Sequence, residues 1–166
     1  MAPDELKKEL EARVASAITP REAAVDVMKG LQRHYGWLTD EAVGEAAELL
    51  ALTPLQVEEL ATFYEMIYRR PVGKRVIHLC DSISCWSVGG EAAMNHLKNR
   101  LGVGPGETTS DRMFTLIPCA CLGNCGEGPT MMIGENIYGC LTPEKIDDII
   151  EQERKAVECV EGLSRL

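Results

Sequence analysis

Seven cysteines are the side chains with the clearest capacity for chemistry in this sequence of 166 residues. Cys80 and Cys85 lie in the segment HLCDSISCW, and Cys121 and Cys125 lie in IPCACLGNCGEGP, which also contains Cys119. An odd number of thiols cannot be used up in disulfides, and neither segment contains the C-x-x-C spacing of a thioredoxin-type dithiol. The thiols therefore indicate a metal or redox site.

Each closely spaced pair of cysteines follows an apolar segment that we expect to form a strand, residues 74–80 and 112–118. Neighbouring strands lie about 4.8 Å apart, so the loops that leave them can bring four thiolates to one centre. Tetrahedral zinc and a [2Fe–2S] cluster both accept four thiolates. Structural zinc usually takes C-x2-C pairs, whereas the spacings here are C-x4-C and C-x3-C, with glycines that let backbone N–H groups approach sulfur. The spacing favours the cluster and leaves zinc as the alternative.

The elements around these cysteines are expected in the order β-α-β-β-α. A helix over residues 86–100 would begin just after Cys85 and direct its first N–H groups at an anionic cluster. The segment TMMIGENIYGC predicts a hairpin that turns at residues 134–136, and Thr142-Pro143 predicts the start of a last helix. This order is typical of a thioredoxin-like α/β layer.

The first 68 residues predict helices only. Helix-start signals occur at Thr19-Pro20, Thr39-Asp40 and Thr53-Pro54, and Glu22 could close a capping box with Thr19. Phe63 and Tyr64 are expected in the core, with a partner interface as the alternative. We therefore expect an α+β protein, with an N-terminal helical bundle over residues 1–70. A thioredoxin-like α/β domain with a four-stranded or similar sheet would follow over residues 71–166.

Composition and charge exclude several classes of function. The net charge of −9 argues against nucleic acid and anionic membranes as main partners. No apolar run approaches the roughly 20 residues needed to cross a bilayer, and the first residues lack the apolar segment of a signal peptide. The basic residues of the segment RRPVGKR are expected to solvate a turn. No residues have a spacing that indicates catalysis, so we expect this chain to have no catalytic residues of its own. Because it also lacks an apolar run that could cross a bilayer and the apolar segment of a signal peptide, we expect a cytoplasmic protein.

Three segments carry a resemblance to a known family: LTPLQVEELATFYEMI, PVGKRVIHLCDSISCWSVGG and FTLIPCACLGNCGEGP. Over about residues 20–155 the chain resembles the thioredoxin-like [2Fe–2S] subunit of NADH dehydrogenase, in the peripheral arm of respiratory complex I. The resemblance implies that Cys80, Cys85, Cys121 and Cys125 bind the irons of one [2Fe–2S] cluster. It also implies a partner subunit that holds FMN, binds NADH and exchanges single electrons with this cluster.

The resemblance leaves an alternative assignment open. Related gamma-type subunits occur in soluble NADH-linked hydrogenases and formate dehydrogenases, and a zinc-stabilised adaptor without redox activity is the rival from a different class. In complex I the protein would be peripheral to the inner membrane and would reach it only through other subunits, without direct insertion.

The extra cysteine of the second segment, Cys119, departs from the family pattern, and we expect it not to bind iron. Pro118 cannot donate to a strand ladder, so pairing is expected to end there and to hold Cys119 near the strand end. Cys140 and Cys159 are expected to be free structural thiols. The three histidines are expected at the surface or in packing, because none pairs with a second histidine beside the cysteines.

Overall fold

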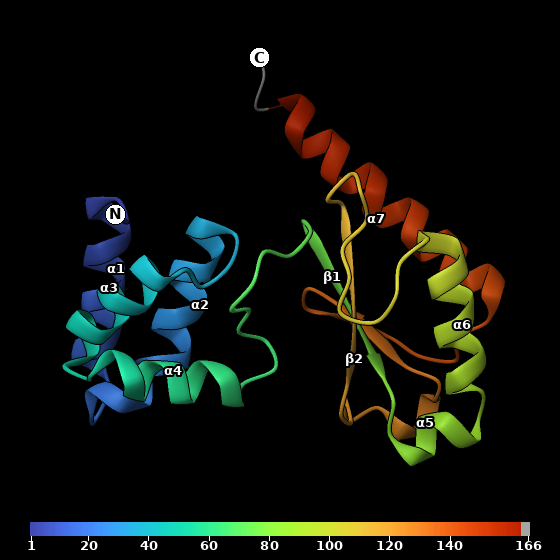
Figure 1. Ribbon diagram of the computed structural model, residues 1–166, viewed down its shortest axis with the longest axis horizontal. Helices are drawn as coiled ribbons and strands as arrows, with labels where there is room; N and C mark the ends of the chain where they lie inside the picture. Colours follow the sequence, from blue (N-terminus) through green and yellow to red (C-terminus); the bar gives the residue numbers. More distant parts are fainter. Residues whose placement is uncertain (164–166) are drawn as a thin grey trace. The chain divides into compact units, whose positions relative to one another are not determined.

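The computed structural model describes residues 1–163, with side chains through residue 159, and divides into two compact units. The first unit, Met1–Pro71, contains helices only, and the second begins at Val72 and contains a sheet (Figure 1). The expected fold class, a helical bundle followed by a thioredoxin-like α/β domain, is confirmed. No helix among the described residues is both long enough and apolar enough to cross a membrane.

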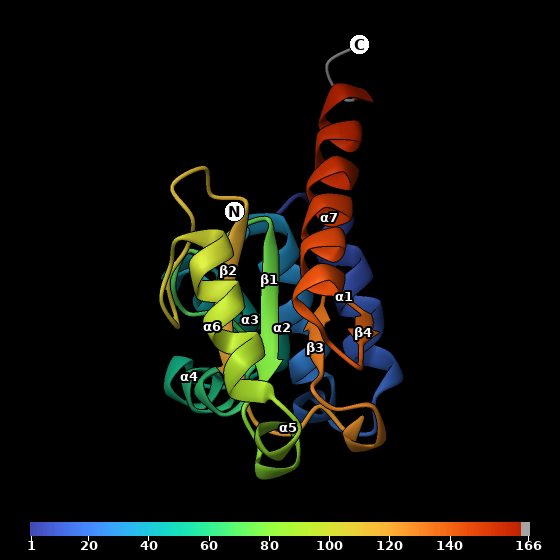
Figure 2. The same cartoon turned by 90° about the vertical axis from the view of Figure 1, so that its right-hand side faces the viewer.

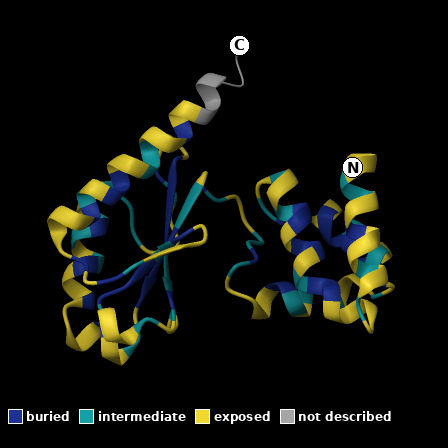
Figure 3. Ribbon diagram, turned by 180° about the vertical axis from the view of Figure 1, so that it is seen from behind, coloured by how far each residue is buried: buried dark blue, intermediate teal, exposed yellow. Residues whose placement is uncertain are grey.

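The helical unit contains four α-helices and one 3-10 turn. They are α1 (Asp4–Ser16), η1 (Pro20–Ala23), α2 (Ala24–Tyr35), α3 (Asp40–Leu50) and α4 (Pro54–Phe63). Their apolar faces form one core, in which the largest fully buried side chains are Met28, Leu31, Leu38 and Leu50. Figure 3 shows that each of these helices has both buried and exposed residues along its length, as amphipathic helices do.

The helix-start signals act as predicted at two of three places. The Thr53 hydroxyl accepts from the N–H of Gln56, whose side chain returns to Thr53, so α4 begins with a complete capping box. Thr39 caps α3 through the N–H of Ala42 at 3.1 Å. The capping box predicted for Thr19 is absent, because the Glu22 carboxylate accepts from the N–H of Ile18 and the chain forms a 3-10 turn first.

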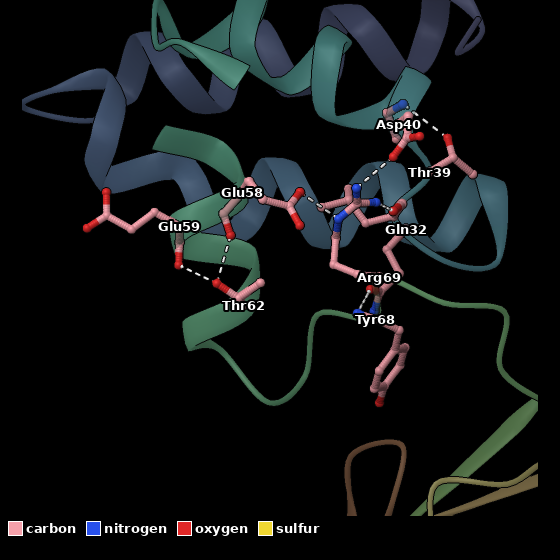
Figure 4. Close-up of polar contacts among 10 residues, drawn as sticks. Gln32, Thr39, Asp40, Glu58, Glu59, Thr62, Tyr68 and Arg69 are labelled. Atoms are coloured by element: carbon pink, nitrogen blue, oxygen red, sulfur yellow. Dashed lines mark hydrogen bonds and ion pairs between the residues drawn. The ribbon is translucent and has the colours of Figure 1, made fainter. Parts of the chain in front are cut away.

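Two other expectations for the helical unit are wrong. Phe63 and Tyr64 are not core residues, since their side chains are 76% and 40% exposed at the end of α4. Arg69 does not simply solvate a turn: its guanidinium binds Asp40 and Glu58, each at 2.7 Å (Figure 4). It also donates to the carbonyl of Leu38. These contacts tie the segment that leaves α4 back onto the helical unit.

The α/β unit contains four strands, three α-helices and one 3-10 turn among its described residues. They are β1 (Arg75–Cys80), α5 (Ile83–Ser87), α6 (Gly90–Leu101), β2 (Phe114–Cys119), η2 (Cys125–Glu127), β3 (Met131–Ile133), β4 (Asn136–Tyr138) and α7 (Pro143–Leu163). The sheet has the order β2-β1-β3-β4, with β1 parallel to β2 and the other neighbours antiparallel. The predicted hairpin and last helix are confirmed.

Helices α6 and α7 lie side by side on one face of this sheet (Figures 1 and 2). Arg100 of α6 pairs with Asp147 and Glu151 of α7, which holds the two helices together at their solvent side. Beneath them the sheet and helices bury a second core, whose largest fully buried side chains include Phe114, Leu116, Ile77, Leu79, Met131, Ile133, Leu97 and Ile146.

The single helix expected over residues 86–100 is divided in two. Gly89, at φ 106°, interrupts it, and the short helix α5 then contains Cys85 instead of following it. A left-handed φ suits glycine and ends a helix, which explains the break. Helix α6 therefore begins further from Cys85 than the expected helix, whose first turn would have faced this thiol.

Candidate metal centre

The parallel pairing of β1 and β2 determines where the cysteine loops begin. Cys80 is the register partner of Cys119 at the last position of both strands. The N–H of Asp81 donates to the carbonyl of Cys119 at 3.0 Å, so pairing continues one residue past Pro118, contrary to our expectation. Proline is tolerated there because β2 is an edge strand of the sheet. Both loops consequently leave the same edge of the sheet.

The first pair of thiols is buried. Cys80 ends β1 and Cys85 lies in α5, with side chains 2% and 1% exposed, and the two thiols share a hydrogen bond. Burial raises the pKa of Cys80, but hydrogen bonds from Ser82, Cys85 and the backbone of Leu122 outweigh it and leave the pKa below its usual value. Burial and the neighbouring Cys80 raise the pKa of Cys85. Within this pair, Cys80 is therefore the thiol that ionises first.

The second pair of thiols lies at the surface of the following loop. The sulfurs of Cys121 and Cys125 are 3.4 Å apart, and the N–H of Gly123 points at the Cys121 sulfur at 3.3 Å. Gly123 has φ 80°, a conformation that lets the backbone turn around this sulfur. The hydrogen bond with Cys121 and the charge of that neighbouring thiol raise the pKa of Cys125, whereas the Ser84 hydroxyl lowers it.

Contacts between the loops bring the two pairs together. The backbone of Leu122 lowers the pKa of Cys80, and the Ser84 hydroxyl lowers the pKa of Cys125, so each loop places a hydrogen-bond donor near a sulfur of the other loop. A Cβ at Gly128 would lie 3.6 Å from the Cys85 sulfur and 3.7 Å from the Cys125 carbonyl oxygen. The two thiol pairs predicted from the sequence thus lie in adjoining loops at one edge of the sheet.

The donor set suits a two-iron cluster. Within residues 1–159, no group of three or more His, Cys, Asp or Glu side chains could hold a metal ion as those side chains lie, so the thiols are present as two separate pairs. Two thiol pairs, with backbone N–H groups directed at the sulfurs, are what a [2Fe–2S] cluster requires, because each of its irons takes two protein ligands. Cys80, Cys85, Cys121 and Cys125 are the residues that could hold it.

The other cysteines have different surroundings. Cys119 is 2% exposed and pairs with Cys80 at the end of β2, so it is fully buried. Cys140 is exposed, with φ 48°, in the turn after β4, and its N–H donates to the carbonyl of Glu127. Cys159 is exposed on α7.

The histidines lie in the kinds of place that were expected. His78 is 1% exposed within β1, in the core of the α/β unit. His96 of α6 pairs with Asp147 of α7 at 3.0 Å, and His34 is exposed with its ring edge against Tyr35.

Four residues close to the thiols were not identified from the sequence: Ser82, Ser84, Leu122 and Thr130. Ser84 lies one position before Cys85, where a hydroxyl could have been noticed as a donor to sulfur. Leu122 acts through its backbone, which a side-chain pattern does not reveal. Thr130 lies outside both cysteine segments, and only its place in the fold relates it to them.

The chain is similar in sequence to known proteins. Residues 9–154 match the family model described as thioredoxin-like [2Fe-2S] ferredoxin. An NADH-quinone oxidoreductase subunit from Buchnera aphidicola subsp. Acyrthosiphon pisum (strain APS) is 44% identical over 131 residues, 79% of this chain and 81% of the relative. The protein of the same name from Escherichia coli (strain K12) is 43% identical over 133 residues, 80% of each chain.

A solved structure is similar over much of the chain. An NAD+-reducing [NiFe]-hydrogenase in the H2-reduced state superposes with a TM-score of 0.66 at 25% sequence identity. The match covers 78% of this chain and 22% of the hydrogenase chain. The present chain therefore corresponds to about a fifth of a much larger polypeptide in that enzyme.

Proposed function

The chain belongs to the thioredoxin-like [2Fe–2S] ferredoxin family, and from this premise we propose that it is an electron-transfer subunit of an NADH:quinone oxidoreductase. It binds one [2Fe–2S] cluster through Cys80, Cys85, Cys121 and Cys125, and exchanges electrons with the FMN of a partner subunit that oxidises NADH. The chain contributes no substrate site. The supporting observation is the meeting of four thiols as two pairs at one edge of the sheet.

In this function, the residues around the sulfurs would adjust the reduction potential of the cluster. A bound [2Fe–2S] cluster takes up and releases one electron at a time. The chain holds the four sulfurs and surrounds them with donors, which include the backbone of Leu122 at Cys80 and the N–H of Gly123 at Cys121. Because hydrogen bonds to sulfur and solvent exposure affect the reduction potential, these groups adjust the cluster to its partner.

The test of this function begins with metal content. The chain purified under anaerobic conditions from native cells should contain two irons and two acid-labile sulfides per molecule, as a [2Fe–2S] cluster requires. Dithionite should produce one paramagnetic signal, and NADH should produce the same signal only when the flavin subunit is present. Stoichiometric zinc without iron would overturn the proposal in favour of the zinc-stabilised adaptor.

Exposed apolar side chains beside the thiols support docking of the flavin subunit at this edge. Ile83, Trp86 and Val88, in and after α5, are 74%, 56% and 55% exposed. A partner that approaches the sulfurs closely would bury them. Trp86→Ser should weaken binding of the flavin subunit by about fivefold or more with unchanged iron content, since buried tryptophans dominate many interfaces. Ile137→Ser, also exposed and apolar but on β4, is the control and should bind normally.

The helical unit offers a second apolar surface on α4. Leu55 and Phe63 are 79% and 76% exposed, although the unit has a complete core of its own. We assign this surface to the same partner subunit. Phe63→Ser should weaken the complex without changing the iron content, and unchanged affinity would remove α4 from the interface.

A second candidate function rests on the likeness to the NAD+-reducing hydrogenase. The chain would then serve as the gamma-type subunit of a soluble NADH-linked hydrogenase or formate dehydrogenase. The two functions differ in the proteins that co-purify with the chain from native cells. Quinone-reducing membrane subunits support the first, and a hydrogenase or formate dehydrogenase subunit supports the second.

A further inference from the structure

Thr130 is a buried polar residue between the second cysteine loop and β3. Its side chain is 1% exposed, and all three of its polar groups are engaged. Its carbonyl accepts from the N–H of Cys80 at 3.0 Å, and its own backbone N–H faces the Cys85 sulfur. The backbone of one residue therefore holds the N–H of Cys80 and faces the sulfur of Cys85.

The hydroxyl of Thr130 contacts the other loop. It lies 3.2 Å from the carbonyl oxygen of Asn124, which precedes η2, and 3.3 Å from that of Glu127, the last residue of η2. A hydroxyl has one proton, so it is shared between these two acceptors. The Asn124 carbonyl also accepts from the N–H of Glu127, which closes the turn. The hydroxyl thus fixes the turn on which Cys125 is carried.

We propose that Thr130 is a positioning residue that couples the buried thiol pair to the loop of Cys125, and so fixes the four sulfurs relative to one another. This inference rests on the proposed function, because it concerns the ligands of that cluster. The backbone of residue 130 is present in every variant, so only the link from its hydroxyl to the Cys125 loop can be removed by substitution. Outer partners of metal ligands commonly affect metal affinity by about 10–100-fold.

Removing the hydroxyl can be separated from a general loss of stability. Thr130→Val keeps the branched shape and deletes the hydroxyl, whereas Thr130→Ser keeps the hydroxyl. Thr115 provides the matched control, because it is also buried, and its hydroxyl accepts from the N–H of Gly73 at 2.6 Å. It lies four positions before Cys119 in β2, about 13 Å along the strand from the cysteine loops.

The experiment compares these variants in the full chain loaded with its cluster. We expect Thr130→Val to release iron to a chelator about tenfold faster and to shift the paramagnetic spectrum of the reduced cluster, as a displaced ligand would. Thr130→Ser should restore both properties. Thr115→Val should lower the melting temperature while leaving iron release and the spectrum unchanged. Thr130→Ala deletes the same hydroxyl and carries the same expectation if the valine variant does not fold.

A loaded Thr130→Val chain with the parent rate of iron release and the parent spectrum would overturn the inference alone. The same would follow if Thr115→Val changed both properties equally, because the effect would then reflect stability. A parent chain without iron and sulfide would overturn the proposed function together with the inference.

Discussion

Cys119→Ala and Cys121→Ala are expected to affect different properties of the α/β unit, although only one residue separates the two cysteines. Cys119 is 2% exposed at the end of β2, where it packs as a small apolar group. Cys121 is exposed, with its sulfur 3.4 Å from that of Cys125. The first substitution should therefore cost stability, and the second should cost the cluster.

The size of each effect follows from burial. Removing the buried Cys119 sulfur resembles the deletion of one or two buried methylene groups, so the apoprotein should lose about 1–2 kcal/mol of unfolding free energy. For a domain of this size, each kcal/mol lowers the melting temperature by about 4–8 °C. Removing the exposed Cys121 sulfur should change the stability of the apoprotein by less than about 0.5 kcal/mol.

Two measurements test this contrast. Thermal unfolding of the metal-free variants gives the stability, and iron, sulfide and the paramagnetic spectrum give the cluster. Cys119→Ala should melt at lower temperature and still hold two irons with the parent spectrum. Cys121→Ala should melt near the parent temperature and hold no cluster, or a labile one with a changed spectrum if Cys119 replaces the missing ligand.

The double variant is the control for that replacement and should hold no iron. The assignment of the ligands would be refuted if Cys119→Ala lost the cluster while Cys121→Ala kept the parent spectrum. Melting temperatures that fell equally in both single variants would refute the reasoning from burial.

Three further predictions concern other parts of the chain. Gly90→Ala should speed iron release, because the added Cβ would lie 2.8 Å from the Cys85 carbonyl oxygen and force the backbone of α5 to move; a parent rate would contradict this. Arg69→Ala should lower the stability of the helical unit by about 1–2 kcal/mol and speed hydrogen exchange at the Leu38 amide, which bonds to the segment that Arg69 holds. Asp111, whose pKa is lowered from 3.8 to about 2 by hydrogen bonds from Thr109 and Arg154, stabilises the fold above pH 4 and loses this contribution as the pH falls toward 2. Asp111→Asn should therefore flatten the acid side of the stability profile in that range, and an unchanged profile would count against it.

Much of the fold could be predicted because local signals and tertiary packing agree. The capping box at Thr53, the hairpin after Thr130 and the final helix all depend on interactions between residues close in sequence. The meeting of the four thiols was also predictable, since strand ends and loop lengths limit where Cys80 and Cys121 can lie.

The remaining features depend on contacts that a linear pattern does not contain. Phe63 has a large apolar side chain of the kind found in cores, but its place at the end of α4 leaves it outside the core that the other helices complete. The break at Gly89 depends on a left-handed backbone that glycine permits but does not require. The contacts of Thr130 exist only in the folded chain, where the segment before β3 lies beside the cysteine loops.

The unequal burial of the two thiol pairs has a consequence for how a cluster would be lost and rebuilt. Oxidants and chelators arriving from solvent contact Cys121 and Cys125 first, whereas Cys80 and Cys85 are covered by the fold. Disassembly of a cluster bound by all four thiols would therefore begin at the exposed pair. The buried pair would keep its position after such damage, because Cys80 lies on strand β1 and Cys85 on helix α5. Repair can then start from two thiols that are already in place, with the loop of Cys121 and Cys125 closing last.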